Sequence, residues 1–129
     1  MRGVSQWFAA FGTAASGERQ VGRVTILDLE GGITFGGGTA DLRHRTRRLI
    51  AEGRADILLN LAGVRYVDSS GLGEMVAAQT AARRVGGRVA VLSPSANVRE
   101  LFEVTALTGV FDIFEDESAA VERMAAGLD

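Results

Sequence analysis

Residues 55–61 form a nearly unbroken apolar run, and this run constrains the fold more than any other part of the sequence. Such a run is typical of a strand that helices cover on at least one face. A second run at 23–30 is rich in β-branched residues and bounded by glycines, so it also predicts a strand. Segments whose apolar residues follow helical spacing alternate with these runs, which indicates an α/β protein.

The expected order of elements is β-β-α-β-α-β-α-β-α. Strands are expected at about 15–21, 23–30, 55–61, 88–92 and 110–114, and helices at about 39–52, 72–84, 94–105 and 116–128. Thr39 is the expected N-cap of the first helix, and Ser93 with Pro94 is expected to begin the third. Alternation of this kind predicts one α/β domain with a mixed or parallel central sheet of about 4–5 strands and about four α-helices packed against it.

The composition of the chain excludes several classes of function. The chain has 129 residues, which suffices for one domain with a real core, and a net charge of −2 without a basic stripe, so no nucleic-acid partner is expected. It has no cysteine and one histidine, His44, so disulfides, thiolate metal sites and multi-histidine metal sites are excluded, and no metal is expected. No cofactor is expected either, because no nucleotide-binding motif is present. No stretch approaches the roughly 18–20 apolar residues that span a bilayer, so there is no firm membrane signal and a cytoplasmic protein is expected.

Residues 1–17 are expected to be an N-terminal extension that precedes a domain at 18–129. Four apolar residues in this extension follow helical spacing: Val4, Trp7, Phe8 and Phe11. The extension is therefore either amphipathic, packing on its own domain or mediating a homodimer, or disordered. A signal peptide fits less well, because Ser5 and Gln6 interrupt the apolar part.

Residues 67–73 lie where a strand is expected to end and a helix to begin. Their sequence is Val-Asp-Ser-Ser-Gly-Leu-Gly. Such a terminus has unpaired N–H groups and a partial positive charge, so it accepts an anion. One interpretation is a well-capped helix. Another is a phosphorylation switch at Ser69 or Ser70, sharpened by Asp68. A nucleophilic serine fits poorly, because the flanking glycines of a nucleophile elbow are missing.

The glycine-rich loop at 31–38 lacks the features of a P-loop or a dinucleotide fingerprint, so a tight strand-to-helix connection explains it better. Phe35 at its centre is either an exposed partner contact or a plug into the core, and the plug is slightly favoured. A cluster of arginines lies at positions 43, 45, 47 and 48. A solvated helix face is the simpler interpretation of this cluster, and an acidic or anionic-lipid partner is the alternative.

These elements resemble a STAS domain, the fold of bacterial anti-sigma-factor antagonists and of the cytoplasmic tails of sulfate transporters. The resemblance covers roughly residues 18–127. It depends on the patterns at 58–61, 64–73, 86–89, 92–95 and 98–102, of which Asp-Ser-Ser-Gly-Leu-Gly at 68–73 is the most specific.

The resemblance implies an anti-sigma-factor antagonist that is not an enzyme. Ser69 matches the hydroxyl that a partner, both anti-sigma factor and serine-protein kinase, phosphorylates in this family, with Ser70 as the alternate. The unphosphorylated protein would bind the kinase, the phosphoprotein would release it, and a PP2C-type phosphatase would restore it. The expected partner-binding residues are Asp68, Ser69, Ser70, Gly71, Leu72, Gly73, Thr34 and Phe35.

One departure from the family is visible in the loop before the first helix, where Thr34 stands at about the place of a frequent aspartate. A second hypothesis is a structural subunit that is not phosphorylated, either in a lipid-transport ABC system or in a stress-signalling scaffold. An enzyme is the third hypothesis, which would require turnover that depends on Ser69 or Ser70.

Overall fold

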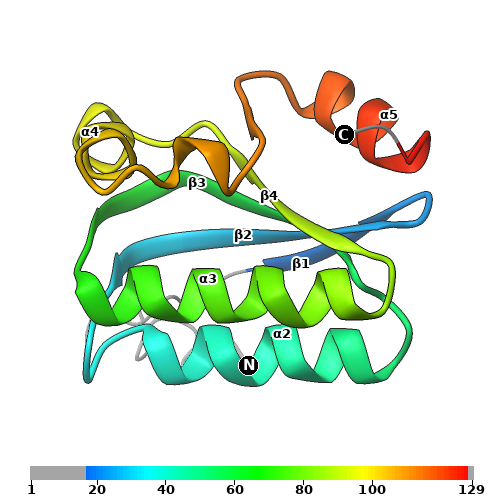
Figure 1. Ribbon diagram of the computed structural model, residues 1–129, viewed down its shortest axis with the longest axis horizontal. Coiled ribbons are helices and arrows are strands. Elements are labelled where there is room, and N and C mark those ends of the chain that lie inside the picture. Colours follow the sequence, from blue (N-terminus) through cyan, green and yellow to red (C-terminus); the bar gives the residue numbers. More distant parts are fainter. Residues whose placement is uncertain (1–16, 128–129) are drawn as a thin grey trace.

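The computed structural model describes residues 17–127, and its centre is a five-stranded sheet in the order β1-β2-β3-β4-β5 (Figure 1). β1 pairs with β2 in antiparallel fashion, and the other neighbours pair in parallel. The strands are β1 (Gly17–Val21), β2 (Val24–Ile33), β3 (Asp56–Val67), β4 (Arg88–Leu92) and β5 (Ile113–Phe114). The predicted mixed sheet is therefore confirmed.

Four α-helices cover the sheet within the described residues. They are α2 (Thr39–Ala51), α3 (Ser69–Arg84), α4 (Ala96–Val104) and α5 (Glu117–Ala125), and a short 3-10 helix spans Leu107–Gly109. Figure 1 shows α2 and α3 side by side along one side of the sheet, with α4 and α5 on the opposite side. None of the helices in residues 17–127 is long and apolar enough to cross a membrane.

The core divides according to the alternation of side chains along the strands. Leu27 and Leu59 belong to the cluster that contains the buried residues of α2 and α3, whereas Ile26 and Leu58 belong to the cluster under α5. Successive side chains of a strand point to opposite faces, so a strand covered on both faces must be apolar throughout. This explains the unbroken apolar run at 55–61.

Two strands are longer than the sequence predicts, and this lengthening builds the site. β2 and β3 continue pairing past the apolar run, through Gly31–Val64 and Ile33–Val67, with register shifts on the way. A Cβ on Gly63 would lie 2.9 Å from the Leu29 carbonyl oxygen, so a glycine permits the close pairing there. As a result, β2 and β3 end side by side.

Several predicted boundaries are corrected. Gly38 is the N-cap of α2 and Thr39 is its first residue, with a hydroxyl that donates to the Thr34 carbonyl. Ser93 has φ +51° and does not cap a helix, because Ser95 caps α4 by accepting from the Val98 N–H. The expected extension, apart from Gly17, lies outside the described residues, as does its role in a homodimer.

Candidate functional site

The candidate site lies where β2 and β3 end together and α3 begins. Ile33 pairs with Val67 at the last position of the two strands. The next residue, Asp68, donates its N–H to the Ile33 carbonyl at 3.3 Å and then serves as the N-cap of α3. Residues that are far apart in the sequence, the 34–38 turn and the start of α3, are thereby brought to one edge of the sheet.

The Asp68 carboxylate connects these two segments. Its Oδ1 accepts a hydrogen bond from the Gly71 N–H at 2.9 Å, and its Oδ2 accepts one from the Phe35 N–H at 3.0 Å. These bonds favour the charged carboxylate, so the pKa of Asp68 lies below its ordinary value, with the Phe35 N–H as the largest cause and the Gly71 N–H next. Asp68 is therefore anionic at neutral pH and holds the turn against the helix.

Gly71 allows the first turn of α3 to sit against the end of β2. A Cβ at this position would lie 2.1 Å from the Ile33 carbonyl oxygen and 2.7 Å from Val67 Cγ1, so no larger residue fits without a shift of the backbone. Gly73 differs, because a Cβ there would meet nothing within 4 Å. Gly71 is thus required for the close packing of α3 against β2, whereas Gly73 has open space beside it.

The hydroxyls of Ser69 and Ser70 are the candidates for phosphorylation. Ser69 is the first residue of α3 and is exposed, and Ser70 is half-buried. Within residues 17–127, neither hydroxyl makes a hydrogen bond, because Asp68 supplies the cap. The structure thus includes the well-capped helix that the sequence suggested. Asp68 provides the cap, and the two serine side chains take no part in it.

Phe35 lies at the tip of a tight turn and is 83% exposed. The Gly37 N–H donates to the Thr34 carbonyl at 2.9 Å, and Gly36 has φ +79°, which glycine adopts readily. The expectation that Phe35 plugs the core is therefore wrong, because this turn directs residue 35 into solvent. The other interpretation, an exposed contact, agrees with its exposure.

Tyr66 is a further residue of this edge, which the sequence did not bring forward. It is 59% exposed, and its ring lies 3.2 Å from where a Cβ on Gly32 would be. Its position follows from the lengthening of β3, in which Val64 and Val67 are buried and Arg65 and Tyr66 are not. The apolar residues at 64 and 67 were the sequence signal for this extension of β3. Gly63, directly after the apolar run at 55–61, suggested a loop instead.

Three of the four arginines of α2 form ion pairs within the described residues, namely Arg43, Arg45 and Arg48. Arg43 Nε lies 3.0 Å from Glu74 Oε2 of α3, and Arg48 pairs with Glu18 of β1 and Glu52. Arg45 pairs with Asp41 one turn earlier. These contacts tie α2 to its neighbours and fit the solvated helix face better than a dedicated site for an acidic partner.

No group of three or more acidic or histidine side chains in residues 17–127 is arranged to hold a metal ion. His44 is exposed on α2 and forms no hydrogen bond with either serine within this part of the chain.

Comparison with known proteins identifies the family. Residues 18–120 match the STAS domain. The chain belongs to the STAS-domain family. It is 32% identical to the anti-sigma-B factor antagonist of Bacillus subtilis (strain 168) over 73 residues, which are 57% of this chain and 67% of that protein. It is also 32% identical to the anti-sigma F factor antagonist of Lysinibacillus sphaericus over 68 residues, 53% of this chain and 57% of that protein, so this match spans just over half of the relative.

Solved STAS structures agree with the fold. The unphosphorylated form of the anti-sigma factor antagonist SpoIIAA superposes with a TM-score of 0.75 at 25% identity, covering 87% of this chain and 97% of that chain. The phosphorylated Bacillus SpoIIAA gives 0.68 at 25% identity, covering 84% and 98%. An anti-sigma factor antagonist from Mycobacterium paratuberculosis gives 0.75 at 17% identity, covering 85% and 92%, which supports the fold alone. The predicted STAS fold is confirmed.

Proposed function

We propose that this STAS protein is an anti-sigma-factor antagonist whose partner binding is switched by phosphorylation of Ser69. The observation that carries the proposal is the state of Ser69: its hydroxyl is exposed, makes no hydrogen bond within the described residues, and directly follows the carboxylate of Asp68. A kinase can reach such a hydroxyl without unfolding α3. The fold does not depend on the hydroxyl, so its modification changes the surface.

The added charge of a phosphate on Ser69 would weaken binding of the partner. A phosphate adds about −1.5 to −2 charges at neutral pH. It would stand beside Asp68, whose own charge is stabilised by the Phe35 and Gly71 N–H groups. The positive end of the α3 dipole tolerates the added anion within the protein itself. A partner that buries this edge must instead desolvate a phosphate next to a carboxylate, so it dissociates.

The proposed partner surface consists of the start of α3 together with the 34–38 turn. Asp68, Ser69, Ser70, Gly71, Leu72 and Gly73 form one half, and Thr34 and Phe35 form the other. Phe35 supplies an exposed aromatic side chain beside the switch, and aromatic residues are enriched at protein interfaces. Gly73 is exposed and has no side chain, so the next turn of the helix can be approached closely. Leu72 and Gly71 are buried and would act by holding this surface in place.

The proposed cycle uses two partners and no catalysis by this protein. An anti-sigma factor that is also a serine kinase would bind the unphosphorylated form and modify Ser69, and a PP2C-type phosphatase would remove the phosphate. The names of the relatives, antagonists of anti-sigma factors F and B, support the first partner. The phosphorylated and unphosphorylated forms of SpoIIAA, a structural neighbour, support the modification.

The test compares Ser69→Ala with Ser69→Asp by calorimetric titration against the cognate anti-sigma factor kinase. Ser69→Ala should bind like the unphosphorylated protein, and Ser69→Asp should bind at least about tenfold more weakly, because it adds charge at the interface. Ser118→Asp is the matched control, since Ser118 is an exposed serine in the first turn of α5 and should leave affinity unchanged. Equal affinity of both Ser69 variants would reject the switch and favour a structural subunit of a transport or scaffold assembly.

A further inference from the structure

Two exposed aromatic side chains lie at the edge where β2 and β3 end. The exposed large apolar side chains within residues 17–127 are those of Val21, Phe35, Tyr66, Val85 and Val104. Only Phe35 and Tyr66 among them are aromatic. The Tyr66 ring lies 3.2 Å from where a Cβ on Gly32 would be, and Thr34 Cγ2 lies 3.5 Å from the same point. The ring is therefore next to the 34–38 turn that carries Phe35.

A β-bulge in β3 brings Tyr66 to the surface. Residues 31–32 of β2 are adjacent, but their partners on β3 are Val64 and Tyr66. Arg65 is therefore an extra residue opposite none of β2. In a regular strand, residues 64 and 66 would lie on one face and residue 67 on the other. The bulge instead places Val64 and Val67 together in the core and leaves Arg65 and Tyr66 exposed.

Arg65 adds a positive charge beside the Tyr66 ring. Its side chain is exposed and forms no ion pair or hydrogen bond within the described part of the chain. Arg19 and Arg43, in contrast, are paired with acidic residues of neighbouring elements. A cation without an acidic neighbour, next to an exposed aromatic ring, is complementary to a surface that presents a carboxylate beside an apolar side chain.

Arg65, Tyr66 and Ser69 are close enough for one partner to cover them. Four steps of extended chain span at most about 14 Å, which bounds the distance between the Cα atoms of Arg65 and Ser69. A standard interface covers about 800 Å² on each partner, so it is roughly 30 Å across. A protein centred on Ser69 therefore covers Arg65 and Tyr66 as well.

We propose that Arg65 and Tyr66 belong to the surface that the anti-sigma factor kinase binds. The partner places an apolar side chain against the Tyr66 ring and a carboxylate against the Arg65 guanidinium. This inference rests on the proposed function and states the chemistry of its partner. The same carboxylate also contributes to release, because Arg65 attracts it in the unmodified protein and a phosphate on Ser69 repels it.

The test is calorimetric titration of the purified cognate anti-sigma factor kinase with variants of the full chain. Tyr66→Ala should bind about tenfold more weakly, because aromatic anchors carry much of the binding energy of an interface. Tyr66→Phe keeps the ring and should bind like wild type. Arg65→Glu should bind about tenfold more weakly at low salt, and this loss should shrink as added salt screens the charges. Arg65 is exposed outside the core, so this variant should keep native circular dichroism.

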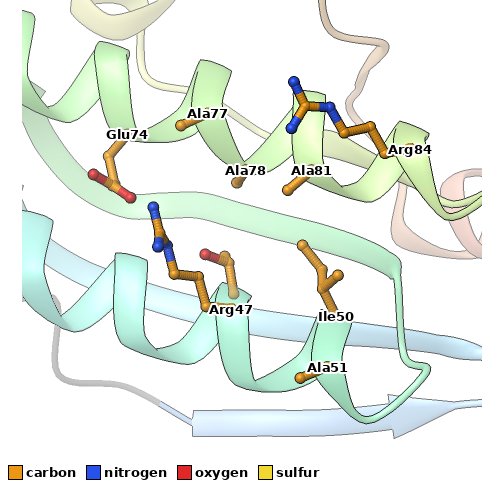
Figure 2. Close-up of a pocket in the computed structure, with 9 residues that line it drawn as sticks. Arg47, Ile50, Ala51, Glu74, Ala77, Ala78, Ala81 and Arg84 are labelled. Carbon is orange, nitrogen blue, oxygen red and sulfur yellow. The ribbon is translucent and has the colours of Figure 1, made fainter.

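Arg84→Glu is the matched control for the charge reversal. Arg84 is exposed and forms no ion pair within residues 17–127. It lines a hollow of about 340 Å³ between α2 and α3, at the opposite end from Glu74 (Figure 2). It lies 15 residues after Ser69 on α3, roughly 22 Å along the helix, so its reversal should leave affinity unchanged. Val85→Ala, at the exposed C-cap of α3, is the control for Tyr66→Ala.

Normal affinity of Arg65→Glu would overturn the proposal, whatever Tyr66→Ala does. An equal loss of affinity in Arg84→Glu would also overturn it, since the effect would then come from net charge. Ser69→Asp separates this contact from the switch. Wild-type affinity of Ser69→Asp, with weak binding by Arg65→Glu and Tyr66→Ala, would reject the switch and support the contact. Weak binding by Ser69→Asp, with normal binding by the other two, would support the switch and reject the contact.

Discussion

The backbone N–H of Phe35 donates to Asp68 Oδ2 at 3.0 Å, so the turn before α2 and the N-cap of α3 are joined through one carboxylate. The other oxygen of that carboxylate accepts from the Gly71 N–H at 2.9 Å. A single side chain therefore fixes the relative position of the exposed Phe35 and the exposed Ser69. This relationship holds the two halves of the proposed partner surface in a fixed arrangement.

Replacing Asp68 by alanine should separate these two segments. Asp68→Ala removes both hydrogen bonds, so the protein should unfold at lower temperature and the Phe35 and Gly71 amides should exchange hydrogen faster. Asp116→Ala is the matched control, since Asp116 caps α5 by accepting from the Ala119 N–H at 2.8 Å and does not contact the turn. It should lower stability without affecting the Phe35 amide. If the Phe35 amide hydrogen exchanged at the same rate in Asp68→Ala as in wild type, Asp68 would not connect the turn to α3.

The two hydrogen bonds to the Asp68 carboxylate should also make the unfolding free energy depend on pH in acid. The pKa of Asp68 is below its ordinary value of 3.8 in the folded protein, because the Phe35 and Gly71 N–H groups donate to the carboxylate. The unfolded chain therefore binds the proton first as pH falls, so the stabilisation is complete above about pH 4 and is lost below it. Urea unfolding of wild type and Asp68→Ala should differ most near neutral pH and converge in acid. A difference that grows below pH 4 would be inconsistent with this assignment.

Gly71, which is buried, and Gly73, which is exposed, should respond in opposite directions to substitution by alanine. Gly71→Ala forces a Cβ to within 2.1 Å of the Ile33 carbonyl oxygen and should cost at least about 2 kcal/mol of unfolding free energy. Gly73→Ala adds its methyl group to open space and should stabilise the helix by up to about 1 kcal/mol. Chemical denaturation measures both. Similar values for the two variants would show that α3 does not pack against β2 as described.

Phe35 should contribute to binding far more than to folding. Phe35→Ala removes a side chain that is 83% exposed, so the unfolding free energy should change by less than about 0.5 kcal/mol. Affinity for the anti-sigma factor kinase should fall about tenfold or more if the ring is an anchor of the interface. Val104→Ala, at an exposed apolar residue at the end of α4, is the control and should bind normally. Normal binding by Phe35→Ala would remove the turn from the partner surface.

The sheet and the helices could be predicted because their patterns are local. The apolar run at 55–61 and the helical spacing of residues 72–84 each follow from one element's own burial. The extension of β3 to Val67 could not be read in the same way, since residues 62–67 pair with β2 only through register shifts that depend on the partner strand. The start of α3 at Ser69 follows from that extension.

The position of Phe35 shows a different limit. An apolar residue in a glycine-rich loop is compatible with burial or exposure, and the Thr34–Gly37 hydrogen bond together with the Asp68 contact decides between them. Similarly, Ser93 and Ser95 are both suitable caps by residue type, and only the backbone selects Ser95. The sequence indicated Asp68 and Ser69 as candidate site residues, but the assignment of the cap to Asp68 required the geometry.

The most direct test of the account is a phosphate map of the native protein. All basic side chains are arginine, so trypsin releases one peptide, residues 66–83, that carries Ser69 and Ser70. The protein would be purified from its own cells, growing and stressed, and fragment ions would assign the phosphate to one serine. The account predicts phosphate on Ser69 in an amount that changes with stress. Phosphate on neither serine in any condition would contradict it.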